Sequence, residues 1–522
     1  MTDHPPRILF AASEVVGFAK TGGLADVAGS LPRALAKRGL DVAVVLPLYH
    51  AVRTGPHPIT PTDVHFSLLL GNRAVQGRLC RTTLPDSEVP VYLVEQPDLF
   101  ERDDPSQGRG LYQYTGPDGR KYDYADNADR FIVFSRAIME TLPQLSPSLP
   151  DQPEAQAKRE HFNILQCNDW QTGLIPCYLR ELYTRQSHRN ARAYAGLHTL
   201  MTVHNIAYQG SFPESVMAHT DLRHRLFNHQ QLEFYGRLNF LKSGCVFADR
   251  ISTVSPRYAE EIQTPEFGCG LEGVLTERKD VLSGIVNGVD YGVWDPATDR
   301  HLAATYDADT AFDRKPANKL ALQAEYGLPR RADVPLFGVV ARLVEQKGIS
   351  LIVQTAPELL AGDMQIVILG EGDPGVHTQL KTLHEQFPQK LGLRLGFDEG
   401  MAHRIEGGAD AFLMPSQFEP SGLNQLYSLR YGTVPVVRAV GGLYDTITDT
   451  TPETLADGTA TGFRFGPYTA AAFLQAVRRA LHCYRDQPDV WRQLVRTGMK
   501  QDWSWDRSAA EYERLYEQMR GG

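Results

Sequence analysis

Short apolar strands alternate with amphipathic helices near both ends of this chain, and this alternation limits most strongly how the chain can fold. Near the N-terminus, residues 8–12 form an apolar run, residues 24–38 carry apolar side chains at helical spacing, and residues 42–46 form a second apolar run. This order of strand, helix and strand indicates a parallel sheet that helices cover on both faces. Pro32 lies inside the helical pattern, where we expect a kink or a break.

The same alternation returns in the C-terminal half of the chain. It predicts strands at residues 336–340, 364–369, 393–396, 410–414 and 434–437, and helices at residues 349–360, 402–407 and 422–431. The sequence therefore predicts an α/β fold with two doubly wound domains that face each other. The cleft between such domains is the default place for a functional site.

Turn-forming residues suggest where the two domains meet. Asn287-Gly288 is a turn signal, and the polar stretch 294–313 follows it closely. We therefore expect a first domain over residues 1–285 and a second over residues 286–500. An amphipathic helix within residues 501–522 is expected to pack back on the first domain. The proline-rich segment 143–160 indicates an exposed insertion.

Composition excludes several classes of protein. The net charge of −9 comes without a basic tract, which argues against a dedicated binder of nucleic acid or anionic membranes. The six cysteines are scattered without C-x-x-C spacing, so neither a zinc ribbon nor a disulfide framework is indicated, and a reducing cytoplasm is the simplest location. No apolar stretch approaches the roughly 18 residues that a membrane-spanning helix needs.

Polar clusters follow several predicted strands, at the edge where open α/β sheets bind ligands. Lys20-Thr21-Gly22-Gly23 joins the first strand to the first helix, where backbone amides and a lysine suit a diphosphate. A glycine turn with a solvated lysine explains this segment equally well. Arg342 and Lys347 follow the strand at 336–340 and could clamp a leaving diphosphate, although a surface ion pair with Glu345 is the simpler explanation for this loop alone.

Glu419 lies between the strand at 410–414 and the helix expected to begin at Gly422. Its carboxylate could accept sugar hydroxyls, while the amides of Gly422 and Leu423 face developing negative charge; alternatively, Glu419 only complements the helix dipole. Asp169 and the pair His204-Asn205 also follow predicted strands, although a lone histidine is more often structural. The one D-x-D motif, Asp307 to Asp309, lies in the polar stretch and indicates a solvated turn, so the sequence predicts no metal site.

Six motifs occur in one order over nearly the whole chain, and together they are much more specific than each alone. They begin at Lys20, Asn168, His204, Asn287, Arg342 and Pro415, and the last contains Glu419-Pro420-Ser421-Gly422-Leu423-Asn424. In these motifs the chain resembles bacterial glycogen synthase and plant starch synthase. The resemblance implies a GT-B fold and a retaining glucosyltransferase that extends α-1,4-glucan from ADP-glucose, without a cofactor.

The resemblance also implies roles for individual residues. Lys20 with the Gly22 and Gly23 amides would hold the diphosphate from the first domain, and Arg342 with Lys347 would hold it from the second. His204, Asn287 and Glu419 would contact the donor glucose, and Asp169 would lie near the sugar or the acceptor. The remaining residues expected at ADP-glucose are Asp26, Asn205, Phe397, Ser421, Gly422, Leu423 and Asn424. We expect Glu419, Arg342, Lys347 and His204 to be the catalytic set.

Three positions depart from the family pattern. Ser421 stands where bacterial members usually have Cys, Asn424 where Thr is common, and Phe397 where an aromatic, often Tyr, stacks on adenine. Phe keeps the stacking face and loses the hydroxyl. Tyr427 also stands where related glycosyltransferases carry a second glutamate, which favours the glycogen synthase group over sucrose or lipid glycosyltransferases.

Three other functions remain open on the sequence. The chain could use UDP-glucose with the same fold, or it could be a catalytically silent glucan-binding homologue. The intact set of Lys20, His204, Arg342, Lys347 and Glu419 argues against a silent protein. A pyridoxal-phosphate glucan phosphorylase shares the two-domain layout but would be much longer. The expected partners are thus ADP-glucose and an α-glucan, with neither nucleic acid nor membrane involved.

Overall fold

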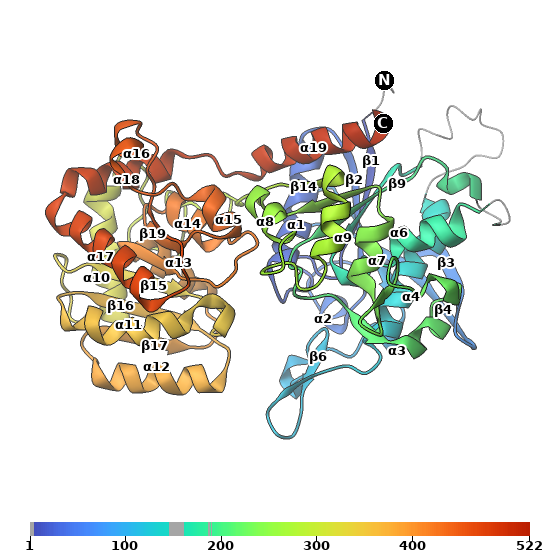
Figure 1. The fold of residues 1–522 in the computed structure, drawn as a ribbon, viewed down its shortest axis with the longest axis horizontal. Coiled ribbons are helices and arrows are strands. Elements are labelled where there is room, and N and C mark those ends of the chain that lie inside the picture. The colour runs from blue at the N-terminus through green and yellow to red at the C-terminus, as the bar shows by residue number, and fades with distance from the viewer. Residues whose placement is uncertain (1–4, 146–160, 186–187, 189–190, 522) are drawn as a thin grey trace. The chain divides into compact units, whose positions relative to one another are not determined.

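The computed structural model describes residues 5–145, 161–185, 188 and 191–521. The chain forms two compact units (Figure 1). Unit 1 comprises Met1–Val254, Ala259–Ile285 and Trp505–Gly522, and unit 2 comprises Ser255–Tyr258 and Val286–Ser504. In the proline-rich segment 143–160, residues 143–145 belong to a short 3-10 turn that begins at Leu142, and residues 146–160 lie outside the described residues.

Unit 1 is built on a nine-stranded sheet with the order β14-β13-β9-β8-β1-β2-β5-β4-β3. Its strands are parallel from β14 to β5, and only β4 and β3 at one edge are antiparallel. Ile8 at the centre pairs with Val42 on one side and with Ile164 on the other. The strands are β1 (Arg7–Ala11), β2 (Asp41–Pro47), β3 (Thr60–Leu70), β4 (Arg73–Thr83), β5 (Pro90–Glu95), β8 (Ile164–Asn168), β9 (His198–Val203), β13 (Arg250–Thr253) and β14 (Leu282–Gly284).

Helices and two small sheets complete unit 1. The longer helices are α1 (Gly23–Lys37), α4 (Asn127–Thr141), α7 (Phe240–Phe247) and α19 (Trp505–Gly521). The short ones are α2 (His50–Arg53), α3 (Pro97–Phe100), α6 (Ile175–Tyr178) and α9 (Glu272–Glu277), while α8 (Pro256–Glu261) begins in unit 2. The small sheets are the hairpin β6 (Gln113–Thr115) with β7 (Lys121–Asp123), and the order β10 (Ser211–Pro213), β12 (Arg237–Asn239), β11 (Glu233–Phe234).

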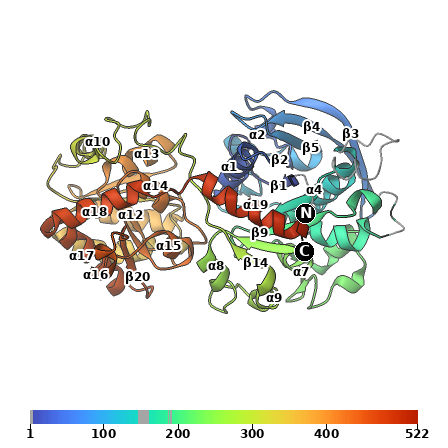
Figure 2. The same cartoon turned by 90° about the horizontal axis from the view of Figure 1, so that it is seen from above.

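Helix α1 continues through Pro32, so of the kink or break expected at this residue the break does not occur. Leu24, Val27, Leu31 and Leu35 are buried on the helix, and each such side chain contributes about 1.5–3 kcal/mol by burial. Together they offset the roughly 3 kcal/mol that an interior proline costs. Helix α19 packs against α1, and Figure 2 shows it lying across unit 1. Its apolar stripe of Tyr512, Leu515, Tyr516 and Met519 is buried, as the sequence predicts.

Unit 2 is built on a six-stranded sheet that is parallel throughout, with the order β17-β16-β15-β18-β19-β20. The first three strands run outward from the centre in one direction and the last three in the other, which is the doubly wound arrangement. The strands are β15 (Leu336–Val340), β16 (Gln365–Gly370), β17 (Leu391–Leu395), β18 (Ala411–Met414), β19 (Val434–Arg438) and β20 (Phe463–Phe465). The predicted α/β fold class is therefore confirmed in both units.

The helices of unit 2 pack on this sheet around a core of buried aliphatic and aromatic side chains. They are α10 (Ala311–Glu325), α11 (Ile349–Ala361), α12 (Pro374–Gln386), α13 (Glu399–Gly408), α14 (Asn424–Arg430), α15 (Gly441–Thr446), α16 (Pro452–Ala456), α17 (Ala470–Asp486) and α18 (Pro488–Lys500). Helix α14 begins at Asn424 rather than at Gly422 as predicted. Gly422 has a φ of 67°, a left-handed conformation that a right-handed helix cannot include. Among the described residues, no helix combines the length and apolar character needed to cross a membrane.

Candidate active site

Several of the predicted site residues follow the strands at which the strand order of each sheet reverses, whereas His204 and Asn205 follow β9 and Phe397 follows the edge strand β17. In unit 1 the reversal lies between β1 and β8, and in unit 2 between β15 and β18. The loops that follow these strands carry Lys20, Asp169, Arg342, Lys347 and Glu419. Ligands of open α/β sheets bind at this position because the two loops diverge there and leave room above the strand ends.

Glu14, which follows β1, organises the loop that carries Lys20. Its buried carboxylate accepts hydrogen bonds from the amides of Thr21 and Gly22, the latter at 3.2 Å, and from the Thr21 hydroxyl at 2.6 Å. Tyr112 donates its hydroxyl to Glu14 Oε1 at 2.8 Å. The amide of Gly22, which the sequence assigned to a diphosphate, is therefore directed at a carboxylate in this structure. Gly23 is the first residue of α1.

Lys20 and Asp26 form an ion pair at the start of α1. Lys20 Nζ lies 2.7 Å from Asp26 Oδ1, and the lysine side chain is 46% exposed. Asp26 lies in the first turn of the helix, where a negative charge complements the helix dipole. The structure therefore brings these two predicted residues together and leaves the lysine accessible to an anion.

Asp169 and His204 are held together behind the strand ends of β8 and β9. Asp169 Oδ1 accepts the amide of His204 at 2.7 Å, and the aspartate has a φ of 55°. Asn168 donates its side-chain amide to the Ala11 carbonyl at 2.9 Å, and its Oδ1 lies 2.9 Å from Nε2 of His204. This arrangement places a proton on Nε2. Asn205, the next residue, accepts the Ala207 amide at 3.0 Å through its side chain.

Burial shifts the pKa values of Asp169 and His204 in the direction that favours the neutral form of each side chain. Desolvation lowers the pKa of His204 to about 3, so the imidazole is neutral at pH 7 and carries its single proton on Nε2. Desolvation raises the pKa of Asp169 to about 7, although hydrogen bonds from the His204 and Asn205 amides oppose the rise. Because Nε2–H is directed at Asn168, His204 offers only Nδ1, as an acceptor, to a ligand, and it cannot neutralise a phosphate.

Lys347 and Glu419 form the central ion pair of unit 2. Lys347 Nζ lies 2.5 Å from Glu419 Oε2, and the side chains are 20% and 7% exposed. Ser416 donates its hydroxyl to the same carboxylate oxygen at 3.0 Å. A partly buried charged pair of this kind fixes the position of both groups, because leaving either charge unpaired would cost desolvation energy.

Glycines allow two segments of unit 2 to pack tightly against the loop that carries Glu419. Gly348 has a φ of 68°, and a Cβ on it would lie 2.0 Å from the Pro415 carbonyl oxygen. A Cβ on Gly441 would lie 2.0 Å from the Glu419 carbonyl oxygen, and one on Gly442 equally close to that of Ser421. The loop after β15 and the start of α15 therefore both pack against the Glu419 segment.

Among the buried side-chain polar atoms of unit 2 that lack a hydrogen-bond partner in the described residues, two belong to predicted site residues. They are Asn287 Oδ1 and Ser421 Oγ. Because buried polar atoms in folded proteins are nearly always hydrogen-bonded, these two atoms are candidates for contact with a ligand. The Asn424 side chain instead donates to the Val340 carbonyl at 2.6 Å, and Leu423 caps α14.

Arg342 and Phe397 lie at the surface of unit 2. Arg342 is exposed directly after β15. Phe397 is 83% exposed and follows Gly396, whose φ of 134° is open only to glycine. A ring this exposed adds little burial energy to folding, and its contact with adenine stays a prediction.

The site residues that the sequence analysis missed are Glu14, Tyr112 and Ser416. Glu14 is the one carboxylate in the segment between β1 and Lys20, and its place directly after a buried strand is the signal that could have revealed it. Tyr112 lies 98 residues from its partner Glu14, and no spacing rule predicts such a contact.

We call Glu14, Lys20, Gly22, Asp169 and His204 the unit 1 cluster, and Arg342, Lys347, Glu419, Ser421 and Gly422 the unit 2 cluster.

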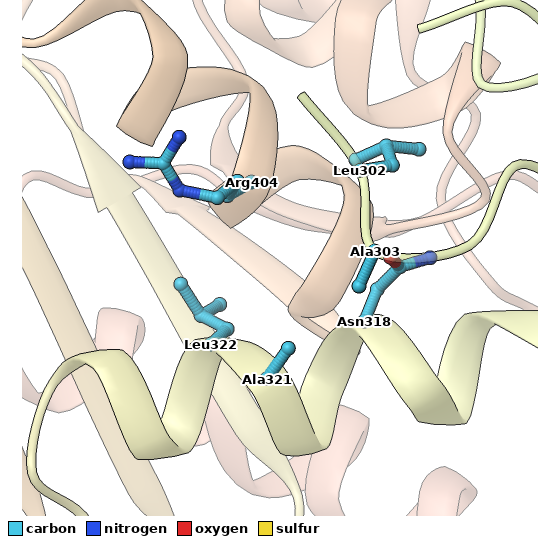
Figure 3. Close-up of a pocket in the computed structure, with 6 residues that line it drawn as sticks. All are labelled: Leu302, Ala303, Asn318, Ala321, Leu322 and Arg404. Atoms are coloured by element: carbon cyan, nitrogen blue, oxygen red, sulfur yellow. The ribbon is translucent and has the colours of Figure 1, made fainter. Parts of the chain in front are cut away.

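One small pocket in unit 2 contains no predicted site residue. It lies between α10, α13 and the segment before α10, has a volume of about 20 Å³, and is drawn in Figure 3. That volume holds about one water molecule. Its lining residues are Leu302, Ala303, Asn318, Ala321, Leu322 and Arg404. Within the described residues, no group of three or more His, Cys, Asp or Glu side chains is placed to hold a metal ion.

Two family models match the chain and together cover most of it. The model for the starch synthase catalytic domain matches residues 7–277, and the model for glycosyl transferases group 1 matches residues 327–496. The glycogen synthase of Anaeromyxobacter sp. (strain Fw109-5) is 47% identical over 512 residues, which is 98% of each chain. Glycogen synthase 1 of Methylococcus capsulatus is 45% identical over 516 residues, covering 99% of this chain and 97% of that one.

Solved structures show the same relationship. The catalytic domain of starch synthase IV from Arabidopsis thaliana, bound to ADP and acarbose, superposes with a TM-score of 0.85 at 30% identity over 99% of this chain and 100% of that one. Sucrose-phosphate synthase from Thermosynechococcus elongatus superposes with a TM-score of 0.55 at 17% identity over 99% of each chain, a likeness of fold alone.

Proposed function

The chain belongs to the glycogen and starch synthase family of glycosyltransferases, and from this membership we propose that it transfers glucose from ADP-glucose to the non-reducing end of an α-1,4-glucan. The transfer retains the configuration at the anomeric carbon and releases ADP. The match to curated glycogen synthases over nearly the full length of both chains supports this activity. ADP is also the nucleotide bound in the similar starch synthase IV structure.

The observation that carries the proposal is the Lys347–Glu419 pair at the strand reversal of unit 2. We assign the nucleotide sugar to this unit. Lys347 and Arg342 would bind the diphosphate, and Glu419 would accept hydroxyls of the glucose. The unpaired Asn287 Oδ1 and Ser421 Oγ would complete the hydrogen bonds to the sugar, and Phe397 would stack on adenine.

The chemistry follows from these charges. The bond between the anomeric carbon and the diphosphate oxygen breaks, which leaves positive charge on the sugar and negative charge on ADP. Arg342 and Lys347 stabilise the departing diphosphate. The acceptor hydroxyl attacks from the same face, and its proton passes to the departing phosphate oxygen. The catalytic contribution of the protein is therefore positioning together with charge stabilisation.

We assign the acceptor to unit 1, together with a second set of diphosphate contacts. The accessible Lys20 and the amide of Gly23 would contact the diphosphate, with Asp26 holding the lysine in place. Neutral His204 would hydrogen-bond a sugar hydroxyl, and Asp169 would orient it through the His204 amide. By this proposal Glu14 positions the loop and does not itself touch the substrate.

We further propose that the enzyme works in the cytoplasm and that its partners there are the nucleotide sugar and the α-glucan. All six cysteines lie in the described part of the chain, and none of them is paired. Unpaired cysteines are the norm in reducing compartments. Fractionation of cells followed by immunodetection tests this location.

Incubation with labelled ADP-glucose and glycogen, followed by linkage analysis of the product, tests the function. We expect label in new α-1,4 linkages at non-reducing ends. Parallel turnover with UDP-glucose at equal concentration tests the donor, and a clear preference for UDP-glucose would overturn the donor assignment. Absence of label from glycogen with both donors would overturn the proposed reaction itself.

A further inference from the structure

Five non-glycine residues in the described part of the chain have a positive φ. Three are aspartates, which tolerate the left-handed region because their short polar side chains can bond locally. The other two are Tyr235, with a φ of 49°, and Cys269, with a φ of 50°. Strain at these two residue types therefore requires a separate explanation.

Tyr235 occupies a turn that other residues would fit better. It forms with Gly236 the two-residue connection between β11 and β12, and both residues have a positive φ. Turns of this kind strongly prefer Asn, Asp or Gly at the first position. The tyrosine side chain is 81% exposed, so its burial does not repay the backbone cost. The ring is thus costly for folding and is presented to solvent.

The segment that contains Cys269 lies against the turn of Tyr235 and is hydrogen-bonded to a loop of the unit 1 cluster. A Cβ on Gly270, next to Cys269, would lie 2.8 Å from the Phe234 ring and 3.3 Å from the Tyr235 ring. The Cys269 carbonyl accepts the side-chain amide of Gln209 at 3.0 Å. Gln209 belongs to the loop that begins at His204.

The loop that carries Gln209 also contacts the segment that follows Asp169. The amide of Leu241, which follows β12, donates to the Gln209 carbonyl at 3.0 Å. A Cβ on Gly210 would lie 2.3 Å from the ring of Trp170, the residue after Asp169. A chain of contacts in unit 1 therefore links the loop after Asp169 and His204, through Gln209 and Cys269, to the turn that carries Tyr235.

We propose that Tyr235 is a docking point for the acceptor glucan, binding a glucosyl unit away from the reacting end. This inference rests on the proposed function for its choice of ligand. A glucopyranose presents axial C–H groups on its faces and hydroxyls around its edge, so it matches a flat exposed ring with polar neighbours. The hydroxyl of Tyr235 itself supplies a hydrogen-bonding group at the edge of that ring.

The strain serves this role by holding the ring in place. The Glu233 carboxylate accepts the Gly236 amide at 2.6 Å, which fixes the turn, and Phe234 packs edge-on against Tyr235 with ring centroids 4.7 Å apart. A ring held rigidly before binding loses less freedom when the sugar arrives. Backbone strain retained at an exposed residue is typical of binding sites for this reason.

The test compares Tyr235→Asn with Tyr235→Phe. Binding of maltoheptaose without nucleotide is measured by calorimetry, and the thermal unfolding midpoint of each variant is recorded. Asn suits the turn, so we expect Tyr235→Asn to unfold at the wild-type temperature or above it and to bind maltoheptaose roughly five- to tenfold more weakly. Tyr235→Phe keeps the ring and should bind within about twofold of wild type. Leu69→Asn, at an apolar residue 57% exposed on β3, is the matched control and should leave binding unchanged.

Kinetics separate this proposal from the proposed function. Tyr235→Asn should raise KM for maltoheptaose and leave KM for ADP-glucose unchanged. If no donor supports transfer but Tyr235→Asn still weakens maltoheptaose binding, the function fails and the docking point stands. Unchanged maltoheptaose binding in a folded Tyr235→Asn protein overturns the docking point. Loss of self-association without loss of glucan binding would also overturn it, because the ring would then contact a second copy of the chain.

Discussion

The ammonium of Lys347 lies 2.5 Å from Oε2 of Glu419 and ties the loop after β15 to the loop after β18. These loops flank the strand reversal of unit 2, and the pair couples the residue assigned to the diphosphate with the residue assigned to the sugar. Each charge therefore sets the position of the other before substrate arrives.

Removing Lys347 is expected to abolish most of the activity. Lys347→Ala should lower kcat by about 10²–10³-fold, the usual cost of one charge-stabilising donor, and Arg342→Ala and Glu419→Ala should lose most activity as well. Because Glu419 is left without its partner, Lys347→Ala should also lose about 1–3 kcal/mol of unfolding free energy. Lys381→Ala, at an exposed lysine on α12, is the control. Near-wild-type turnover in a folded Lys347→Ala protein would remove this residue from the mechanism.

Gly348→Ala should damage the site without removing any functional atom. The new Cβ would meet the Pro415 carbonyl oxygen at 2.0 Å, and the φ of 68° costs a non-glycine residue about 1–2 kcal/mol. The loop must shift, which moves Lys347 away from Glu419, so we expect lower kcat and lower stability to urea. Gly466→Ala is the matched control, because no atom lies within 4 Å of its added Cβ. Equal kinetics for the two variants would show that the loop tolerates displacement.

Glu14 is expected to act on donor binding through the loop that carries Lys20. Glu14→Leu removes the acceptor of the Thr21 and Gly22 amides, and we expect KM for ADP-glucose to rise about tenfold. Glu14→Gln keeps one carbonyl oxygen, and the hydroxyls of Thr21 and Tyr112 can reverse their hydrogen bonds, so much of the affinity should return. If Glu14→Gln were as impaired as Glu14→Leu, charge rather than hydrogen bonding would be the important property.

The pKa of Asp169 predicts how stability depends on pH. Its folded-state value of about 7 lies above the ordinary 3.8, so the carboxyl favours folding fully below about pH 4 and loses this contribution as pH rises through 7. Asn cannot ionise, keeps an acceptor for the His204 amide and tolerates the positive φ. Asp169→Asn should therefore gain unfolding free energy relative to wild type between pH 4 and 7, by at most about 1.4 kcal/mol per pH unit.

Urea unfolding of both proteins at acidic and alkaline pH measures this difference. His204 contributes with the opposite sign, because its pKa of about 3 lies below the ordinary 6.5 and its contribution is lost as pH falls from 6.5 to 3. Both proteins contain His204, so its effect cancels in the comparison. A stability difference that is identical at pH 4.5 and pH 8 would contradict the buried, protonated state of Asp169.

Phe397 is expected to affect donor affinity and not stability. With 83% of its side chain exposed, Phe397→Ala should change the unfolding free energy by no more than about 0.5 kcal/mol. Loss of adenine stacking should raise KM for ADP-glucose several-fold, and Phe397→Tyr should retain the affinity because it keeps the ring. An unchanged KM in Phe397→Ala would place adenine elsewhere.

Sequence periodicity predicted the parallel sheets well, because their strands are short apolar runs between glycine-rich loops. The strand at Leu336–Val340 agrees to the residue. The errors arise where tertiary contacts or backbone conformation decide. Helix α1 continues through Pro32 because most of its side chains are buried, and α14 begins only at Asn424 because Gly422 has a left-handed backbone conformation.

Contacts between distant residues account for the rest of what the sequence could not predict. Strand ends drew attention to Asp169, His204 and Glu419 because parallel strands bring their carboxyl ends to one edge. No repeating pattern in the sequence points to Glu14, and its hydrogen bond with Tyr112 forms only in the folded protein. The neutral state of His204 likewise follows from burial, which residue identity alone does not reveal.

The position of α19 also has a consequence for biosynthesis. Unit 1 uses α19 (Trp505–Gly521), which follows unit 2 in the chain, to cover α1 and to bring the Tyr516 hydroxyl to Gln166. The whole of Val286–Ser504 is translated before that segment, which takes on the order of ten seconds or more at typical elongation rates. Unit 1 is thus completed only after unit 2 has been translated, and until then the face of α1 that α19 covers remains without that partner.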